Sequence, residues 1–120
     1  MFEAQLLIAK DTVNYEVFSP WFPRQGDDAK FTIETIDQDG EPSLDVSVYT
    51  KSSETVGNGT ITAGGATMTA SLTAGANIDA DWAGILNELV RYHFEISGNA
   101  GDWILFRMLP PVWFDSVHAP

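Results

Sequence analysis

The sequence contains no cysteine, few basic residues and no long hydrophobic run. The lack of cysteine excludes disulfides, thiolate zinc sites, iron–sulfur clusters and a thiol nucleophile. Lys and Arg together number 6 against 17 Asp and Glu, which gives a formal net charge of −11. A surface of this sign repels nucleic-acid phosphates and anionic lipid headgroups, so we expect no nucleic acid and no membrane among the partners.

Targeting and membrane-spanning signals are missing too. The first apolar stretch runs only from Leu6 to Ala9 and follows no basic segment, unlike a signal peptide. No window approaches the roughly 20 apolar residues that a bilayer-crossing helix needs. We therefore expect the protein on a virion surface if it is viral, and in the cytoplasm otherwise.

Motifs that carry catalysis are not recognisable in the chain. It has no serine triad pattern, no phosphate-binding loop, no dinucleotide-binding fingerprint and no two-histidine metal motif. His93 stands between Arg91 and Glu95 in an alternating segment, where a cross-strand ion pair or exposure explains it. His118 lies two residues from the C-terminus. We predict that the protein is not an enzyme and has no catalytic residues, no metal and no cofactor.

What the chain does contain is enough apolar material for one core. Its 120 residues are 44% hydrophobic and 12% aromatic, which is typical of a single domain. We predict a β-sandwich domain over residues 1–108 and a proline- and aromatic-rich C-terminal arm over residues 109–120, both parts of one domain.

Apolar residues alternate with polar ones in several segments, as they do in half-buried strands. Two continuous apolar runs, 5–9 and 103–109, suit strands that are covered on both faces. The strand segments that the sequence predicts are 5–9, 31–36, 44–49, 67–74, 90–96 and 103–109, with weaker candidates at 13–18 and 59–63.

Turn residues separate these segments. Asp39-Gly40 predicts a hairpin, residues 97–102 link two strands in a similar way, and Gly64-Gly65 is a third candidate turn. The pattern predicts an all-β fold, a single antiparallel β-sandwich of jelly-roll or immunoglobulin-like type with about 7–8 strands. One segment favours a short helix near residues 80–89, because apolar residues recur there at helical spacing after Asp79, a candidate N-cap.

Two clusters combine proline with large aromatic residues, at 18–23 and 109–114. Proline fixes the backbone and removes a hydrogen-bond donor, so neither cluster continues a central strand. Each either closes one end of the sandwich or anchors a partner, because aromatic side chains dominate interface hot spots. The candidate partner-binding residues are Trp21, Phe22, Pro110, Pro111, Trp113 and Phe114.

The acidic residues raise the question of calcium. An EF-hand register with Gly40 at its sixth position fails, because Thr35 and Val46 then occupy the first and twelfth ligand positions. A different calcium site built from Asp27, Asp28, Asp37 or Asp39 stays open beside the simpler interpretation as turn caps. Arg107 interrupts an apolar run, and we expect it to pair with a carboxylate or with an acidic partner.

These observations favour assembly over catalysis. The leading hypothesis is a structural subunit that decorates or cements a viral capsid or similar lattice, as the head-decoration proteins of tailed bacteriophages do, with capsid or lattice subunits and further copies of itself as partners. One alternative is a carbohydrate- or calcium-binding module. Another is an adaptor that adds a partner strand to a free sheet edge, formed by the uncharged hairpin of residues 60–74.

Overall fold

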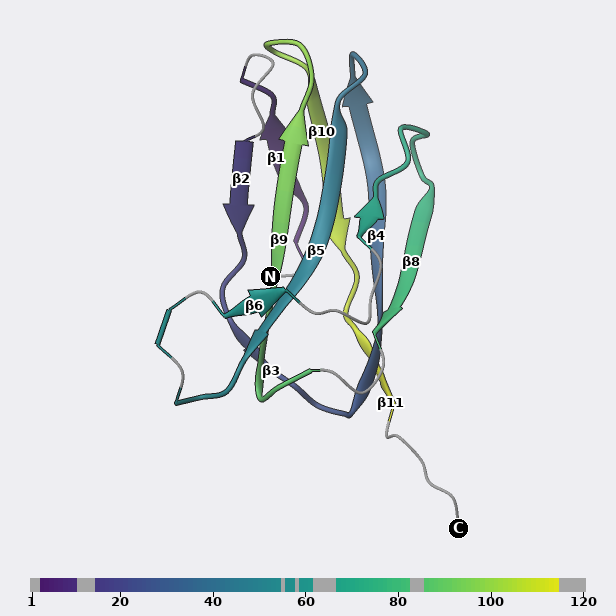
Figure 1. Cartoon of the computed structure of the whole chain (residues 1–120). Coiled ribbons are helices and arrows are strands. Elements are labelled where there is room, and N and C mark those ends of the chain that lie inside the picture. The colour runs from purple at the N-terminus through teal and green to yellow at the C-terminus, as the bar shows by residue number, and fades with distance from the viewer. Residues whose placement is uncertain are drawn as a thin grey trace.

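The computed structural model describes residues 3–10, 15–54, 56–57, 59–61, 67–82 and 86–114, and these form strands and no helix (Figure 1). The strands are β1 Gln5–Ile8, β2 Tyr15–Phe18, β3 Phe22–Pro23, β4 Asp28–Asp39, β5 Ser43–Lys51, β6 Thr60–Ile61, β7 Met68–Thr69, β8 Asn77–Trp82, β9 Leu89–Ser97, β10 Trp103–Met108 and β11 Val112–Phe114. All pairings between them are antiparallel.

The first sheet is built around the long strand β4. Strands β8 and β11 both pair with Ala29 and Lys30, and β8 and β10 both pair with Ile33 and Glu34. Because a strand has only two edges, β10 and β11 must follow one another along one edge of β4, with β8 on the other. Strand β1 pairs with the far side of β10. The order across the first sheet is therefore β1, β10 with β11, β4, β8.

The second sheet follows the same logic around β9 and β5, which pair along their whole length. Strands β2 and β3 pair with successive parts of β9. Strands β6 and β7 pair with successive parts of β5. The order across the second sheet is β2 with β3, β9, β5, β6 with β7.

These two orders give eight strand positions, four in each sheet. One set of pairings joins strands from the two ends of the chain inward: β1 with β10, β2 and β3 with β9, β4 with β8, and β5 with β6 and β7. The remaining pairings, of β4 with β10 and β11 and of β5 with β9, join these strand pairs into two sheets. A long antiparallel hairpin rolled up in this way is a jelly roll. The all-β, antiparallel sandwich prediction is confirmed, and of its two named topologies this is the one found.

Side chains that point between the sheets form one core. Aromatic rings dominate it: the rings of Phe31 and Tyr92 meet edge to face at 5.5 Å, and those of Phe94 and Phe106 lie 5.2 Å apart. Alternating positions of β5 and β9 supply much of the rest, as the sequence pattern predicts: Leu44, Val46, Val48, Val90 and Ile96. The space between the two sheets is thus filled by packed side chains.

The predicted hairpins are wrong where the structure describes them. The turn at Asp39-Gly40 joins β4 to β5, and residues 97–102 join β9 to β10. In both places the chain crosses from one sheet to the other instead of pairing with itself. Gly40 adopts a φ of 75°, so the need for a turn residue is real although the turn closes no hairpin. The candidate turn at residues 64–65 lies outside the described residues.

The predicted helix near residues 80–89 is wrong for the residues that the structure covers there. Residues 80–82 belong to β8, which pairs with β4, and Leu89 begins β9. Leu86 is buried in the connection between them, and residues 83–85 lie outside the description. Ile78 and Ala80 pack against the core from β8. Tertiary burial of that strand outweighs the helical spacing that begins at Trp82.

The alternating segment 67–74 forms a strand only at Met68 and Thr69. Thr35 explains why it ends there, because its buried hydroxyl donates a 2.7 Å hydrogen bond to the Ser71 carbonyl. The carbonyl of Thr35 also accepts a 2.7 Å bond from the Gly75 amide, and its own amide donates to the Ala76 carbonyl. Thr35 of the first sheet thereby holds the corner at which the chain leaves the second sheet.

Candidate interaction surfaces

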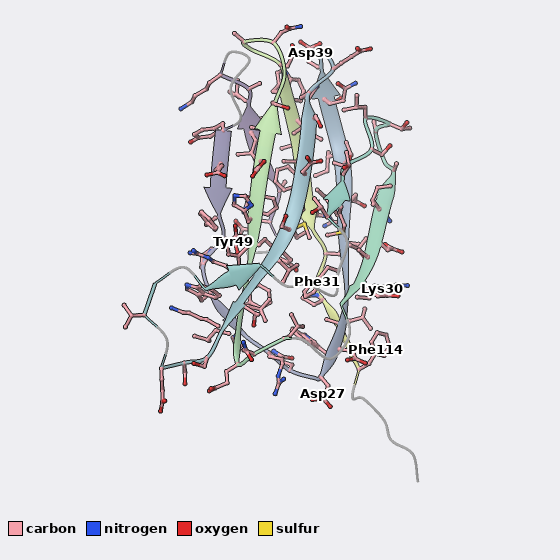
Figure 2. The ribbon with its side chains drawn as sticks, viewed as in Figure 1. Asp27, Lys30, Phe31, Asp39, Tyr49 and Phe114 are labelled. Carbon is pink, nitrogen blue, oxygen red and sulfur yellow. The ribbon has the colours of Figure 1, made fainter. Side chains whose placement is uncertain are left out.

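The C-terminal aromatic segment points in two directions. Trp113 is half-buried and its ring meets that of Phe31 edge to face, with centroids 6.1 Å apart. Val112 and Phe114, on either side of it, are about half exposed. Figure 2 shows Phe114 at the outside of the molecule. Pro110 is exposed and Pro111 half-buried. Trp113 therefore helps to close the core. Phe114 is exposed, and its contact with a partner stays a prediction.

The residues of the N-terminal aromatic cluster, 18–23, also differ in exposure. Phe22 is buried in the core, with its ring 5.4 Å from that of Tyr92, and offers no surface to a partner. Trp21 is half-buried and lies beside Lys51 and Arg91 on the outer face of the second sheet. Ser19 accounts for the path between the strands, because its hydroxyl accepts a 2.9 Å bond from the Tyr92 amide. The chain is thus held against β9 on both sides of Pro20.

Cations and aromatic rings stack on this outer face. The Arg91 guanidinium lies 4.1 Å from the ring centre of Phe18 and 4.5 Å from that of Trp21. The Lys51 ammonium lies 4.7 Å from the Trp21 ring centre. Burial lowers the pKa of Arg91, and the neighbouring Tyr49 partly opposes this effect. Such cation–π contacts stabilise the folded state. The ring of Trp21 is therefore in contact with two cations of the same chain.

His93 lies next to this stack on the same face. Its ring is 4.6 Å from that of Phe18 and 5.2 Å from that of Tyr49. Its Nε2 atom is 3.3 Å from Glu16 Oε1 and 3.8 Å from Glu95 Oε1. The predicted cross-strand pairing of His93 with a carboxylate is found at Glu16. The alternative, that His93 is exposed, is wrong, because the neighbouring rings cover it. The ligand atoms of these three residues lie within 4.8 Å of one another, the spacing of a group that could hold a metal ion.

The outer face of the first sheet carries a different surface. Leu6 and Ile8 of β1 are 54% and 47% exposed, and Trp103 and Leu105 of β10 lie beside them, half-buried. These four residues, the apolar edge patch, line one shallow depression. The register explains their proximity, because Ile8 pairs with Trp103 and Leu6 with Leu105. Within the single chain, the prediction that runs 5–9 and 103–109 are covered on both faces is therefore wrong.

Sequence reasoning missed the apolar edge patch for a definite reason. A continuous apolar run is typical of a strand buried on both sides, and the pattern does not say which side another element covers. The signal was nevertheless present, since Gln5 to Ala9 carry no charge in a chain of net charge −11. Arg107, further along β10, is exposed, and its Nε atom donates to Glu34 Oε1 at 2.7 Å, so the expected carboxylate pairing is confirmed.

The four aspartates considered for calcium do not meet. Asp27 and Asp28 lie at the start of β4, whereas Asp37 and Asp39 lie at its other end. Figure 2 shows Asp27 and Asp39 at opposite ends of the molecule. Twelve residues of extended strand separate the ends by roughly 35 Å, so the two pairs cannot share one ion. Asp37 lies within β4 and not in a turn, and its carboxylate accepts a 2.8 Å hydrogen bond from the Gln38 amide.

Comparisons with known proteins do not assign this chain: no family model, no curated protein and no solved structure matches it. In the described part of the chain no helix is long and apolar enough to cross a membrane.

Proposed function

We propose that the protein is a non-enzymatic structural subunit that assembles with other protein subunits, first of all with copies of itself. The observation that supports this most directly is the apolar edge patch. Exposed clusters of large apolar side chains are typical of protein–protein interfaces. Here the cluster lies on two strands whose sequence would suit burial on both faces, so an additional chain supplies the missing cover.

The free edge of β1 indicates how two copies of the chain would pair. Among the described residues, β1 pairs with β10 alone, and its other edge contains no proline and no charge between Ala4 and Ala9. Edges without such protection accept a further strand. Antiparallel pairing of two β1 strands about a two-fold axis at Leu7 brings Leu6 of one copy opposite Ile8 of the other. The two apolar edge patches then merge into one surface.

Electrostatics favours the same location. Two molecules of net charge −11 repel one another over most of their surfaces. The uncharged segment from Ala4 to Ala9 minimises this repulsion while it buries apolar area, at about 25 cal/mol for each Å² removed from water.

The most specific form of the proposal is a subunit that decorates or cements a viral capsid or similar lattice. Jelly rolls serve in viral shells as well as in lectins and cupins, so the topology is compatible with this role. A core filled by packed rings suits a structural part better than a container for a small ligand. Val112, Phe114 and Pro110 offer a second exposed contact at the end of the first sheet.

The other two hypotheses have weaker support. A sugar-binding platform needs open aromatic faces, whereas Trp21 contacts Lys51 and Arg91 and Trp113 contacts Phe31. Strand addition along residues 60–74 needs a long free edge, whereas Met68 and Ala70 are buried and the strand there spans two residues.

The experiment that tests assembly is sedimentation velocity over a wide concentration range, with Leu6→Lys as the disrupting variant. We expect the wild-type chain to form dimers or larger species and Leu6→Lys to stay monomeric, because it places charge on the shared surface. Val56→Lys is the matched control, since Val56 is 96% exposed and follows β5 of the second sheet, whereas β1 belongs to the first. A monomeric wild-type chain at every concentration, or equal association by Leu6→Lys, contradicts the proposal.

A further inference from the structure

Three carboxylates stand in one row across the second sheet. Glu16 of β2 pairs directly with Glu95 of β9, and Glu95 pairs directly with Asp45 of β5. Directly paired residues on antiparallel strands point to the same face, and this is the outer face because Phe94 and Ile96 point into the core. Like charges directly opposite one another destabilise a sheet, so a positive charge close to this row stabilises it.

Asp45 is partly accounted for, because its carboxylate accepts a 2.8 Å hydrogen bond from the Thr69 hydroxyl. The other two carboxylates converge on His93, which is 4% exposed and held by the rings of Phe18 and Tyr49. A buried imidazole fixed in place, with its Nε2 atom directed at two carboxylates, is an arrangement of metal ligands as well as an ion pair.

We propose that Glu16, His93 and Glu95 form a binding site for a divalent transition-metal ion of the zinc type. Ligands about 2.0–2.2 Å from a tetrahedral metal lie roughly 3.3–3.6 Å from one another. His93 Nε2 is 3.3 Å from the Glu16 oxygen and 3.8 Å from the Glu95 oxygen, close to those values. Glu16 is well exposed, so its side chain is free to make the small movement that closes the site.

The ligand set selects the kind of metal. Imidazole together with carboxylate suits zinc and its neighbours, whereas calcium and magnesium prefer sites made of oxygen alone. A bound dication would neutralise the two facing glutamates. It would also join β2, at the edge of the sheet, to β9 in its middle, so its role here is to fasten the edge of the second sheet. Three protein ligands leave the remaining coordination to water.

The test is isothermal titration calorimetry of the full chain with zinc chloride, calcium chloride and magnesium chloride. The protein is first freed of metal with a chelator. We expect one zinc ion to bind per chain, to be preferred over both other ions, and to raise the melting temperature, since a ligand of the native state stabilises it. Glu16→Gln removes one ligand at an exposed position and should weaken zinc binding by at least about tenfold.

Glu41→Gln is the matched control, because it makes the same chemical change at an exposed glutamate outside the site. Glu41 lies in the connection between β4 and β5. This variant should bind zinc like the wild type. The proposal is overturned if the wild-type chain binds no zinc, if Glu16→Gln binds it equally well, or if calcium binds as tightly as zinc. These outcomes are independent of self-assembly through β1.

Discussion

Trp113 and Phe31 meet edge to face, with ring centroids 6.1 Å apart, although 81 positions separate them in the chain. The contact exists because β11 pairs with the start of β4, which brings Trp113 opposite Ala29. An aromatic segment near the C-terminus thereby becomes part of the core at one end of the sandwich. Its neighbour Phe114 points the other way and is exposed. Two adjacent aromatic residues therefore differ in their contribution to the core.

This contrast predicts a difference in stability between two alanine variants. Trp113→Ala should lower the free energy of unfolding by about 2–3 kcal/mol, since it removes a large ring packed on the core. Phe114→Ala should change it by no more than about 0.5 kcal/mol, because that ring is about half exposed. Urea denaturation of both variants provides the measurement. Equal losses would show that the two rings do not differ in this way.

The stack around Arg91 gives a second prediction. Arg91→Ala should lower the free energy of unfolding by about 1–2 kcal/mol, because the guanidinium contacts the rings of Phe18 and Trp21 in a buried setting. Arg107→Ala is the control, since its ion pair with Glu34 is exposed and is worth at most about 1 kcal/mol. Thermal or urea denaturation compares the two. An Arg107→Ala loss as large as that of Arg91→Ala would speak against the stack.

Tyr92 supplies a prediction about pH. Burial raises the pKa of Tyr92 well above its usual value. Above about pH 10 the unfolded chain loses this proton while the native state keeps it, so the native state binds more protons and its stability falls as the pH rises. The expected decline is up to about 1.4 kcal/mol for each pH unit above 10, with the full stability present below that pH.

Tyr92→Phe tests this dependence. The Tyr92 hydroxyl is buried and has no hydrogen-bond partner among the described residues, so its removal at neutral pH should be neutral or stabilising by up to about 1 kcal/mol. Urea titrations on both sides of pH 10 should show a shallower decline for Tyr92→Phe than for the wild type. Identical declines would exclude Tyr92 as their source.

The corner held by Thr35 provides a fourth prediction. Thr35→Val keeps the shape of the side chain but removes the hydrogen bond to the Ser71 carbonyl, which should cost about 1–2 kcal/mol of unfolding free energy. The Gly75 amide, which donates to the Thr35 carbonyl, should then exchange its hydrogen faster. Thr32→Val, on the outer face of the same strand, is the control and should leave both quantities nearly unchanged. Normal exchange at Gly75 in Thr35→Val would contradict the role of this corner.

Much of the local structure was predictable from the sequence. The alternation in segments 44–49 and 90–96 identified strands β5 and β9 and their buried residues correctly, because side-chain direction in a strand has a period of two that needs no knowledge of the partner. The pairing of His93 and of Arg107 with carboxylates was predictable for a similar reason, since cations are scarce in this chain and acids abundant. The convergence of Glu16 and Glu95 on His93 was not, because it depends on the register between β2 and β9.

The errors share one physical origin. A turn residue such as Gly40 satisfies the same backbone requirement whether the chain pairs with itself or crosses to the other sheet. In the same way, the apolar runs that include Leu6 and Leu105 do not specify which of their faces another element covers. Burial on both faces and pairing in a hairpin both depend on where remote segments of the chain lie. A local sequence pattern therefore cannot predict them.

By itself, the sequence determined that the chain forms strands, which residues alternate toward a core, and that its surface is acidic and free of thiol chemistry. Only the tertiary structure decided which strands are neighbours, because β1 meets β10 and β2 meets β9 across most of the length of the chain. Those pairings place the apolar edge patch on an open face and bring the carboxylates of Glu16 and Glu95 to His93. Both surfaces arise from contacts between distant segments, whose free energy depends on packing and register and not on any local pattern.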